Sequence, residues 1–250
     1  MTRIILTGAL GKMGRVIQSI VGNRDNCIIV AGVDRFNDNS ASFPVYEKLS
    51  EVNEEADVIV DFSNPSLLDE LLEYAKEHNC ALVIATTGYD ECQKKKINDA
   101  SKETAIFFTY NMSIGINLLA SLAKKAVNVL GNDFDIEIIE EHHNQKIDAP
   151  SGTALMLADA ISEEFDKPMR YEYDRHSKRE KRTKDEIGIH SIRGGTIVGE
   201  HKILFAGRDE NITLSHSARS KEVFAVGAVN AAIFMKSKAP GMYDMGELVK

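Results

Sequence analysis

The first 110 residues alternate short apolar runs with longer helical patterns, and this alternation constrains the fold more than any other feature. The apolar runs show no clear period of two, as expected for strands covered on both faces. One helix start is marked by Asn64 before Pro65, a capping residue followed by proline. Strands alternating with helices predict a parallel sheet with helices on both faces. The predicted strands are Arg3–Thr7, Cys27–Val33, Asp57–Phe62, Ala81–Thr86 and Ala105–Thr109, and the predicted helices are Lys12–Val21, Pro65–His78 and Glu91–Lys102.

The pattern changes after residue 113. Several strand-like runs then follow one another without intervening helices, which predicts a mixed or antiparallel sheet of α+β type. A last helix, about Lys221–Lys236, is apolar on most of its surface, so we expect it to be buried. The other elements predicted here are helices at Ile114–Leu130 and Ser151–Phe165 and strands at Phe134–His143, Gly188–Arg193, Thr196–Ala206 and Asn211–Ser217.

A glycine-rich segment, Gly8 to Gly14, joins the first predicted strand to the first predicted helix. Its spacing, G-x-x-G-x-x-G, differs by one residue from the commoner dinucleotide fingerprint. Glycine allows a sharp turn and close approach of a pyrophosphate, and the helix N-terminus supplies oriented N–H groups. The segment Gly8-Ala9-Leu10-Gly11-Lys12-Met13 is therefore a candidate cofactor loop; the alternative is an ordinary tight turn.

Asp34 ends the second predicted strand, 20 residues beyond Gly14. An acidic side chain there can accept hydrogen bonds from ribose hydroxyls, which favours NADH. Arg35, helped by Lys12, could instead hold a 2′-phosphate, so we expect both NADH and NADPH to be usable. The alternative is that Asp34 is a surface loop residue.

Two further segments lie just past the carboxyl ends of predicted strands, where ligands of open α/β sheets bind. Either segment taken separately could equally be a plain turn. They are Thr86-Thr87-Gly88 and Tyr110-Asn111-Met112-Ser113.

The segment from Glu140 to Ala154 holds the candidate chemistry. His142 and His143 point to opposite faces of a strand, which argues against two adjacent zinc ligands, and no metal site is predicted. Lys146 could return to the same cleft as a histidine. The alternative is that both histidines are solvated strand-end residues.

Ser151-Gly152-Thr153 has the pattern of a helix start, with Ser151 as N-cap. Main-chain N–H groups of Gly152 and Thr153 could hold a substrate carboxylate there. A lysine, titratable histidines and an oxyanion-binding helix end suit an anionic substrate that needs proton transfer. The alternative is that Ser151 is merely a cap.

The run Ile136 to Ala154 closely resembles the signature of the dihydrodipicolinate reductase family of lysine and diaminopimelate biosynthesis. Met112 stands where the family usually has Phe, which we interpret as a packing variation near the nicotinamide. The resemblance covers nearly the whole chain, through the glycine loop, Asp34-Arg35, Thr86-Thr87-Gly88, residues 111–117, residues 194–201 and residues 241–245.

The resemblance implies a fold and an activity. The fold is α/β, with a Rossmann-type doubly wound parallel sheet in residues 1–113 and 219–250. A central α+β domain with a mixed sheet, residues 114–218, would bind substrate and form a homotetramer. The family reduces 4-hydroxy-tetrahydrodipicolinate, a cyclic dicarboxylate, to tetrahydrodipicolinate with NADH or NADPH and releases water.

The resemblance also implies roles for the candidate residues. His142 would donate and accept a proton, Lys146 would be a second proton donor, and His143, Gly152 and Thr153 would bind substrate. The cofactor would contact the Gly8–Met13 loop, Asp34, Arg35, Thr86 to Gly88 and Tyr110 to Ser113. Two alternatives remain: a dehydrogenase for another small acid, and a non-catalytic nicotinamide-sensing module.

Composition bears on partners and location. Thirty Lys+Arg against 38 Asp+Glu give a formal net charge of −8, which disfavours sequence-independent nucleic-acid binding. Cys27, Cys80 and Cys92 lack metal-ligand spacing and are interpreted as reduced thiols. No apolar stretch approaches the roughly 20 residues that span a bilayer, so we expect a cytoplasmic protein without a membrane partner.

A charged run at Arg175–Glu186 has six basic and three acidic side chains among its twelve residues. Such a run is usually a solvated face; here it could also be a mobile basic loop that concentrates a dicarboxylate near the substrate site. Arg193 could likewise face the substrate, although nothing in the sequence places it there.

Overall fold

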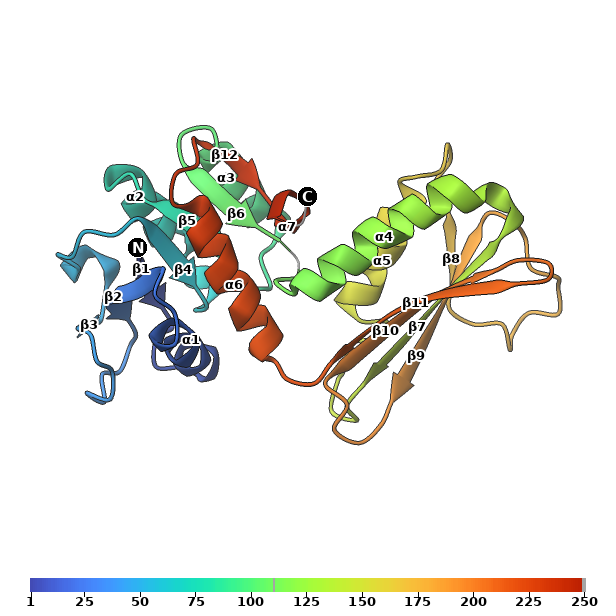
Figure 1. Ribbon diagram of the computed structural model, residues 1–250, viewed down its shortest axis with the longest axis horizontal. Helices are drawn as coiled ribbons and strands as arrows, with labels where there is room; N and C mark the ends of the chain where they lie inside the picture. The colour runs from blue at the N-terminus through green and yellow to red at the C-terminus, as the bar shows by residue number, and fades with distance from the viewer. Residues whose placement is uncertain (110, 249–250) are drawn as a thin grey trace. The chain divides into compact units, whose positions relative to one another are not determined.

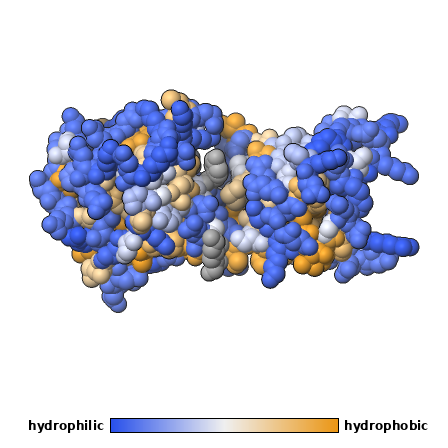
Figure 2. Space-filling model, turned by 90° about the horizontal axis from the view of Figure 1, so that it is seen from above, coloured by the Kyte–Doolittle hydropathy of each residue, from blue (hydrophilic) through white to orange (hydrophobic). Residues whose placement is uncertain are grey.

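The computed structural model describes residues 1–109 and 111–248, which form two compact units (Figure 1). The first unit comprises Met1–Ser113 and the segment that begins at Glu222, and the second comprises Ile114–Lys221. Hydrophilic residues cover much of the surface of both units in the view of Figure 2.

The first unit is built on a seven-stranded sheet in which every pairing is parallel. Its strand order, β12-β6-β5-β4-β1-β2-β3, is the doubly wound arrangement that the sequence predicted, so the expected fold class is confirmed. The strands are β1 (Thr2–Thr7), β2 (Cys27–Val33), β3 (Val45–Tyr46), β4 (Val58–Asp61), β5 (Ala81–Ile84), β6 (Ala105–Phe108) and β12 (Gly241–Tyr243).

Helices cover both faces of this sheet. α2 (Leu68–Glu77) and α3 (Glu91–Ala100) contribute to one core cluster with alternate residues of the central strands, such as Ile5 and Ile59. The intervening residues, such as Leu6, are equally buried. This two-sided burial explains why the strands lack a period of two.

The other face is covered by α1 (Lys12–Gly22) and α6 (Glu222–Met235), which contact each other. α6 returns to this unit after the second unit is complete and packs against β4, β5 and β6. Half of its fourteen residues are buried, as its apolar sequence predicted. The short α7 (Met245–Leu248) follows β12.

The second unit contains a five-stranded sheet of order β11-β10-β7-β9-β8. β7 pairs with β9, and β9 with β8, in parallel; β10 pairs antiparallel with both β7 and β11. The predicted mixed sheet is therefore confirmed. Its strands are β7 (Asp135–His142), β8 (Arg170–Glu172), β9 (Glu186–Arg193), β10 (Gly199–Ala206) and β11 (Asn211–Ala218).

Two helices, α4 (Ile114–Leu130) and α5 (Gly152–Ser162), share a hydrophobic core with one face of this sheet. Exposure along β7 alternates strictly, and Ile136, Ile138, Glu140 and His142 are its buried members. The face that carries Glu140 and His142 is therefore the face that carries the core.

The expectation that no apolar stretch is long enough to span a bilayer is wrong for one segment. Residues 114–133, which comprise α4 and the 3-10 turn after it, are 20 residues long and apolar enough by length and composition to cross a membrane. α4 packs into the core of the second unit through buried side chains, and a core helix passes the same test of length and composition. These side chains are Ile116, Leu119, Ala123 and Val127.

The basic run around Arg182 lies against β7, β8 and β9 of the second sheet and is paired with carboxylates there. The Arg182 guanidinium donates to Glu137 Oε1 at 3.0 Å and to the carbonyl oxygens of Ile136 and Glu186 at 2.9 and 2.7 Å. Lys184 Nζ lies 3.0 Å from Asp135 Oδ1. Arg175 and Lys178 form ion pairs with Glu186 and Glu172. These four cations are paired with carboxylates of the sheet, and Arg182 is the most buried of them, with 17% of its side chain exposed.

Candidate active site

The glycine loop turns sharply at the carboxyl end of β1. Gly8 has φ +69°, and a Cβ there would lie 2.3 Å from the Phe62 carbonyl oxygen. A Cβ on Gly14 would lie 2.2 Å from the carbonyl oxygen of Ala9. A residue with a Cβ would clash with the backbone at both positions, so glycine allows the loop to pack closely against the start of α1. Gly11, the N-cap of α1, and Lys12 are exposed, so the backbone here fits an approaching pyrophosphate.

Asp34 follows β2 directly and lies beside this loop. Its Oδ2 accepts a hydrogen bond from the Leu10 N–H at 2.9 Å, and the Gly8 N–H donates to the Val33 carbonyl oxygen at 2.9 Å. The structure thus brings Asp34 to the glycine loop, half-buried, while Arg35 is exposed beyond it. Asp34 therefore holds the loop as well as being a candidate ribose ligand.

Sequence reasoning missed Arg15, which ties the loop to the segment after β2. Its guanidinium donates to the Leu10 carbonyl oxygen at 3.1 Å, to Ser40 Oγ at 3.0 Å and to Asp38 Oδ2 at 2.6 Å. The hydroxyl of Ser40 and the guanidinium lower the pKa of Asp38 to about 2. Arg15 lies one turn into α1 without any motif of its own, so only the fold reveals the contact.

A buried carboxylate, Asp61, organises the carboxyl ends of β1, β4 and β5. It is fully buried and accepts from Thr7 Oγ1 at 2.6 Å and from the Tyr89 hydroxyl at 3.4 Å. Burial and the Asp61 charge raise the pKa of Tyr89. Thr86 Oγ1 accepts from the Ser63 N–H at 2.9 Å, so the predicted Thr86 belongs to this network. Thr87 and Gly88 are exposed just beyond it.

The segment after β6 is only partly described. Asn111 and Ser113 are buried, and the Ser113 N–H donates to Asn111 Oδ1 at 2.8 Å. Met112 is also buried, with 4% of its surface exposed. Tyr110, another predicted cofactor contact, lies outside the described residues.

In the second unit, Glu140 and His142 form a hydrogen-bonded pair on the inner face of β7. His142 Nδ1 lies 2.5 Å from Glu140 Oε2. Burial raises the pKa of Glu140, but the hydrogen bonds that it accepts from Arg193, Ser191 and His142 outweigh this and hold it at about 2. The carboxylate is therefore ionised and can only accept, so Nδ1 carries the proton and Nε2 is the free ring atom of His142.

Arg193, at the end of β9, grips the same carboxylate. Its Nη1 and Nη2 donate to Glu140 Oε2 and Oε1 at 2.8 and 2.7 Å, a bidentate pair, and Nη2 also donates to the Asp148 carbonyl oxygen at 2.6 Å. The parallel pairing of β7 with β9 sets His142 opposite Arg193. The Arg193 side chain thus points towards the Glu140 carboxylate of the candidate site and not into open solvent.

His201 on β10 completes the inner row. Its ring lies edge-on to that of His142, with centroids 5.2 Å apart, and its Nε2 lies 3.1 Å from Ser151 Oγ. Burial, and then the nearby His142, lower the pKa of His201 to about 4, so this histidine is neutral at pH 7. Its Nδ1 is buried without a protein partner among the described residues.

Lys146 lies in the turn that follows β7. Its N–H donates to the His143 carbonyl oxygen at 3.1 Å, and its Nζ lies 2.9 Å from Asp148 Oδ1. Burial is the main cause of the lowered pKa of His142; the Glu140 carboxylate opposes it, and the charges of Lys146 and Arg193 add to it. The positive charge of Lys146 therefore acts on the imidazole of His142. His143 is half-buried beyond the end of the strand.

Ser151 caps α5, as predicted. Its Oγ accepts from the Ala154 N–H at 3.1 Å, and its own N–H donates to Glu140 Oε1 at 3.1 Å. Gly152 is exposed, and a Cβ there would meet nothing within 4 Å. Thr153 is half-buried beside it. The first turn of α5 is therefore held by Glu140 on one side and open at Gly152 on the other.

Three members of the second site were not assigned from sequence: Glu140, Arg193 and His201. Glu140 could have been found, because two residues before His142 on a strand means the same face. The other two come from β9 and β10, and only strand register brings them there.

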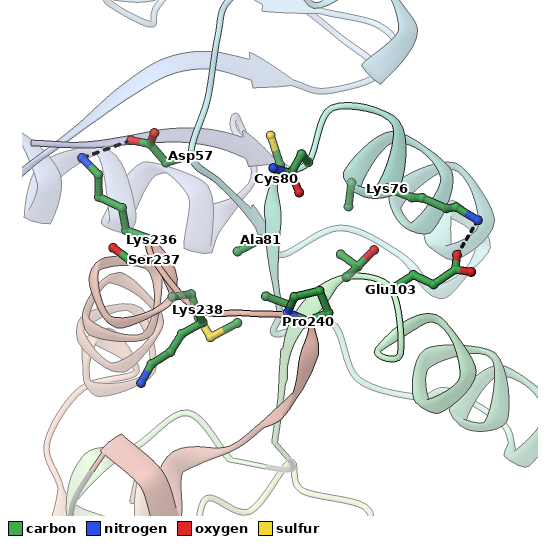
Figure 3. A pocket seen from close by; sticks show the side chains of 14 residues that line it. Asp57, Lys76, Cys80, Ala81, Glu103, Lys236, Ser237, Lys238 and Pro240 are labelled. Atoms are coloured by element: carbon green, nitrogen blue, oxygen red, sulfur yellow. Dashed lines mark ion pairs between the residues drawn. The ribbon is translucent and has the colours of Figure 1, made fainter.

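A pocket of about 260 Å³ in the first unit lies apart from these residues (Figure 3). It opens at the amino ends of β4, β5 and β6, near Asp57, Ala81 and Ala105, whereas the glycine loop follows the carboxyl end of β1. Lys236 Nζ lies 3.5 Å from Asp57 Oδ2, and Lys76 pairs with Glu103. These charges are neutralised in place, and we assign the pocket no role.

A doubly wound dinucleotide sheet and a separate unit with a His–Glu pair, a lysine and an open helix start define a nicotinamide-dependent oxidoreductase of a small anionic substrate. The family model "Dihydrodipicolinate reductase, N-terminus" matches residues 2–112, and "Dihydrodipicolinate reductase, C-terminus" matches residues 115–249. The chain belongs to the dihydrodipicolinate reductase family.

Individual relatives agree with this membership. A 4-hydroxy-tetrahydrodipicolinate reductase from Caldanaerobacter subterraneus subsp. tengcongensis is 51% identical over 250 residues, covering 100% of this chain and 99% of that protein. The protein of the same name from Clostridium novyi is 48% identical with the same coverage. A dipicolinate-bound dihydrodipicolinate reductase from Paenisporosarcina sp. TG-14 has a TM-score of 0.80 and 28% identity, covering 98% of this chain and 97% of that one.

Family membership and the Rossmann-type unit together imply a nicotinamide cofactor. They are equally compatible with its two forms, NADH and NADPH.

Proposed function

We propose that this chain reduces 4-hydroxy-tetrahydrodipicolinate to tetrahydrodipicolinate with NADH or NADPH, in lysine and diaminopimelate biosynthesis. The observation that carries the proposal is the cluster in the second unit: a His142–Glu140 pair at 2.5 Å, with Lys146 and the open start of α5 beside it. Membership of the dihydrodipicolinate reductase family supports it. The cluster has no use in a sensor that only binds nicotinamide.

The substrate is a dicarboxylate, and the start of α5 suits one of its carboxylates. N–H groups at a helix N-terminus point outwards and carry a partial positive charge. Gly152 leaves room for the carboxylate to approach, and Thr153 lies next to it. We assign Gly152, Thr153, Ser151 and His143 to substrate binding, with Ser151 also holding the helix start in place.

The reaction takes up one hydride and one proton and releases one water. A bound dihydronicotinamide supplies the hydride. Hydride addition to the conjugated ring builds negative charge, which the Lys146 ammonium can neutralise. His142, hydrogen-bonded through Nδ1 to Glu140, donates the proton from Nε2. Lys146 is assigned as the second proton donor, to the ring hydroxyl that leaves as water; the ring gives up one C–H proton in that elimination, so the net uptake stays at one proton.

The cofactor contacts are assigned to the first unit. The backbone of Gly8-Ala9-Leu10-Gly11-Lys12-Met13 would hold the pyrophosphate, and Asp34 the ribose hydroxyls. The exposed Arg35 and Lys12 are available for a 2′-phosphate, which supports the use of both cofactors. The remaining contacts are assigned to Thr86, Thr87, Gly88, Tyr110, Asn111, Met112 and Ser113.

The test is NADH oxidation by the purified protein with pyruvate and aspartate semialdehyde freshly condensed by the synthase that makes the cyclic substrate. We expect oxidation that depends on both the synthase and this chain. Absence of oxidation with that mixture would overturn the proposal, and oxidation with a different small acid instead would favour the general dehydrogenase alternative.

Lys146→Met tests the assigned chemistry. We expect kcat to fall by roughly a hundredfold or more, because a cation and a proton donor are lost, while the Kd for NADH stays nearly unchanged. Lys181→Met is the matched control, because Lys181 is exposed. A folded Lys146→Met protein with wild-type turnover would refute the role of this lysine.

We also propose that the chain is a cytoplasmic homotetramer assembled through the second unit. The helices α4 and α5 cover one face of the mixed sheet. The other face carries Ile192, 46% exposed, beside half-buried Ile139 and Leu204. This face also carries charged side chains, among them Glu137, Glu141 and Lys202, so the proposed interface between copies combines apolar contacts with ion pairs.

A further inference from the structure

Glu140 has more partners than any other side chain near His142, and family membership assigns it no task. It is fully buried on β7 and ionised. A buried carboxylate is costly unless every lone pair has a donor, so its partners indicate what it is retained for. Those partners are His142 Nδ1, both terminal nitrogens of Arg193, the Ser191 side chain and the Ser151 N–H.

These contacts divide into two groups. Oε2 accepts from His142 at 2.5 Å, which fixes the tautomer and the ring plane, so Nε2 is the atom that faces away from β7. Oε1 accepts from the Ser151 N–H at 3.1 Å, which fixes the start of α5. One carboxylate therefore sets both the imidazole and the helix start.

Arg193 counteracts the effect of the Glu140 charge on the pKa of His142. A lone carboxylate at 2.5 Å would stabilise the imidazolium and make His142 a weak acid. The bidentate guanidinium shares the carboxylate charge and also adds a positive charge near the ring. The imidazole thus receives an aligned hydrogen bond without the full pull of an unshared carboxylate.

We propose that Glu140 is a positioning residue that orients His142 for proton donation, and that Arg193 is the residue that limits how strongly Glu140 holds the proton. The proposal rests on the proposed function for its kinetic test. It concerns residues that act through His142 and need not touch the substrate.

Other charged or titratable groups face the His142 ring from the neighbouring segments. His201 faces it from β10 and is neutral at pH 7. Lys146 approaches from the turn after β7, paired with Asp148. None of these changes in the two variants below, so a shift in the pH profile reports on Glu140 and Arg193.

The variants Glu140→Gln and Arg193→Met are expected to move the pH profile of kcat in opposite directions. Proton donation needs protonated His142, so kcat falls as the pH rises through the pKa of His142. Glu140→Gln removes the carboxylate and lowers the pKa of His142, so the fall in kcat moves to lower pH. Arg193→Met removes the guanidinium and raises the pKa of His142, so the fall in kcat moves to higher pH. We expect a displacement of roughly one pH unit each way.

Glu140→Gln should also lower kcat roughly tenfold to a hundredfold, less than loss of His142 itself, with the Kd for NADH unchanged. Glu140→Asp, which restores the charge, should return the pH profile towards wild type. Glu163→Gln is the matched control: the same change on an exposed residue of the second unit, which should leave kcat and its pH profile as they are.

A purely structural role would lower kcat or the melting temperature in both variants without opposite displacements, and that result would overturn the proposal. Histidine NMR titration gives the pKa of His142 without substrate, assigned by the signal that is missing in His142→Asn. This titration measures the displacement of the His142 pKa in both variants even if the wild-type protein fails to reduce the cyclic substrate. Failure of this inference and failure of the proposed function are therefore distinguishable.

Discussion

At the scale of single residues, the second site is a set of charges that neutralise one another inside a largely apolar unit. Glu140 is ionised because Arg193 and His142 face it, and His201 is neutral because burial and the nearby His142 lower its pKa more than Glu140 raises it. Two histidines whose rings are 5.2 Å apart therefore differ in protonation behaviour for physical reasons that the sequence does not display.

His201 predicts how stability depends on pH. Its pKa lies at about 4 in the folded chain against about 6.5 when unfolded, so between these values the unfolded state binds the extra proton. The contribution of His201 is fully present above pH 6.5 and is lost as the pH falls towards 4. At about 1.4 kcal/mol per pH unit, the second unit should lose up to about 3 kcal/mol of unfolding free energy over this range.

The measurement is urea unfolding from pH 7 to pH 4, comparing wild type with His201→Gln. The variant should be less stable at pH 7 and show a flatter dependence on pH. His176→Gln, a change at an exposed histidine, should leave the curve as it is. Parallel curves for wild type and His201→Gln would contradict the assignment. Glu140 titrates lower, near pH 2, and is therefore separable.

At the scale of elements, the sequence predicts long, two-sided or alternating strands well and short edge strands poorly. β3 has two residues and β8 and β12 have three, too few to show a period. The predicted helix at Pro65–His78 begins as a 3-10 turn, Pro65–Leu67, and becomes α-helical at Leu68. Patterns of a few residues are decided by the neighbours they pack on, not by their own propensity.

The candidate sites follow the same division. The glycine loop, Asp34, His142, Lys146 and the α5 start could be found because their spacing along the chain carries a physical meaning. Arg193 could not be placed, since it lies 53 residues from Glu140 and reaches it only through the pairing of β7 with β9. Register between parallel strands is a property of the folded sheet.

The basic run also belongs to this scale, because Arg182 fastens it to β7 and β9. We predict that Arg182→Ala lowers the unfolding free energy of the second unit by roughly 2 kcal/mol, since Glu137 and two backbone carbonyls lose their donor. The KM for the cyclic substrate should not change, because the run is paired with the sheet.

Urea unfolding and steady-state kinetics test this, with Lys181→Ala as the control from the same run. Lys181 is exposed, and its replacement should leave stability within about 0.5 kcal/mol of wild type. A rise in KM in Arg182→Ala without loss of stability would instead support a loop that concentrates the dicarboxylate.

At the scale of the whole molecule, a net charge of −8 coexists with two proposed anion sites. The positive potential is local: the start of α1, the start of α5, and a few placed cations such as Lys146. Overall charge therefore bears on solubility, and the position of each charge bears on binding.

The proposed tetramer is tested by sedimentation velocity. Wild type should sediment with the mass of four chains. Ile192→Lys places a charge on the uncovered face of the mixed sheet and should yield smaller species. Val129→Lys, at an exposed position of α4, should leave the sedimenting mass unchanged. A wild-type protein that is monomeric at micromolar concentration would refute the tetramer. Dissociation by Val129→Lys alone would place the interface on α4 instead of the uncovered sheet face.

The return of α6 to the first unit has a consequence for synthesis on the ribosome. Ala228, Val229 and Ala232 are fully buried, yet all of residues 114–221 are translated before them. The second unit can therefore finish folding while one face of the first sheet, around β4 and β5, still lacks its covering helix. In the nascent chain, the second unit, to which we assign substrate binding as a proposal, is complete before the first unit can close.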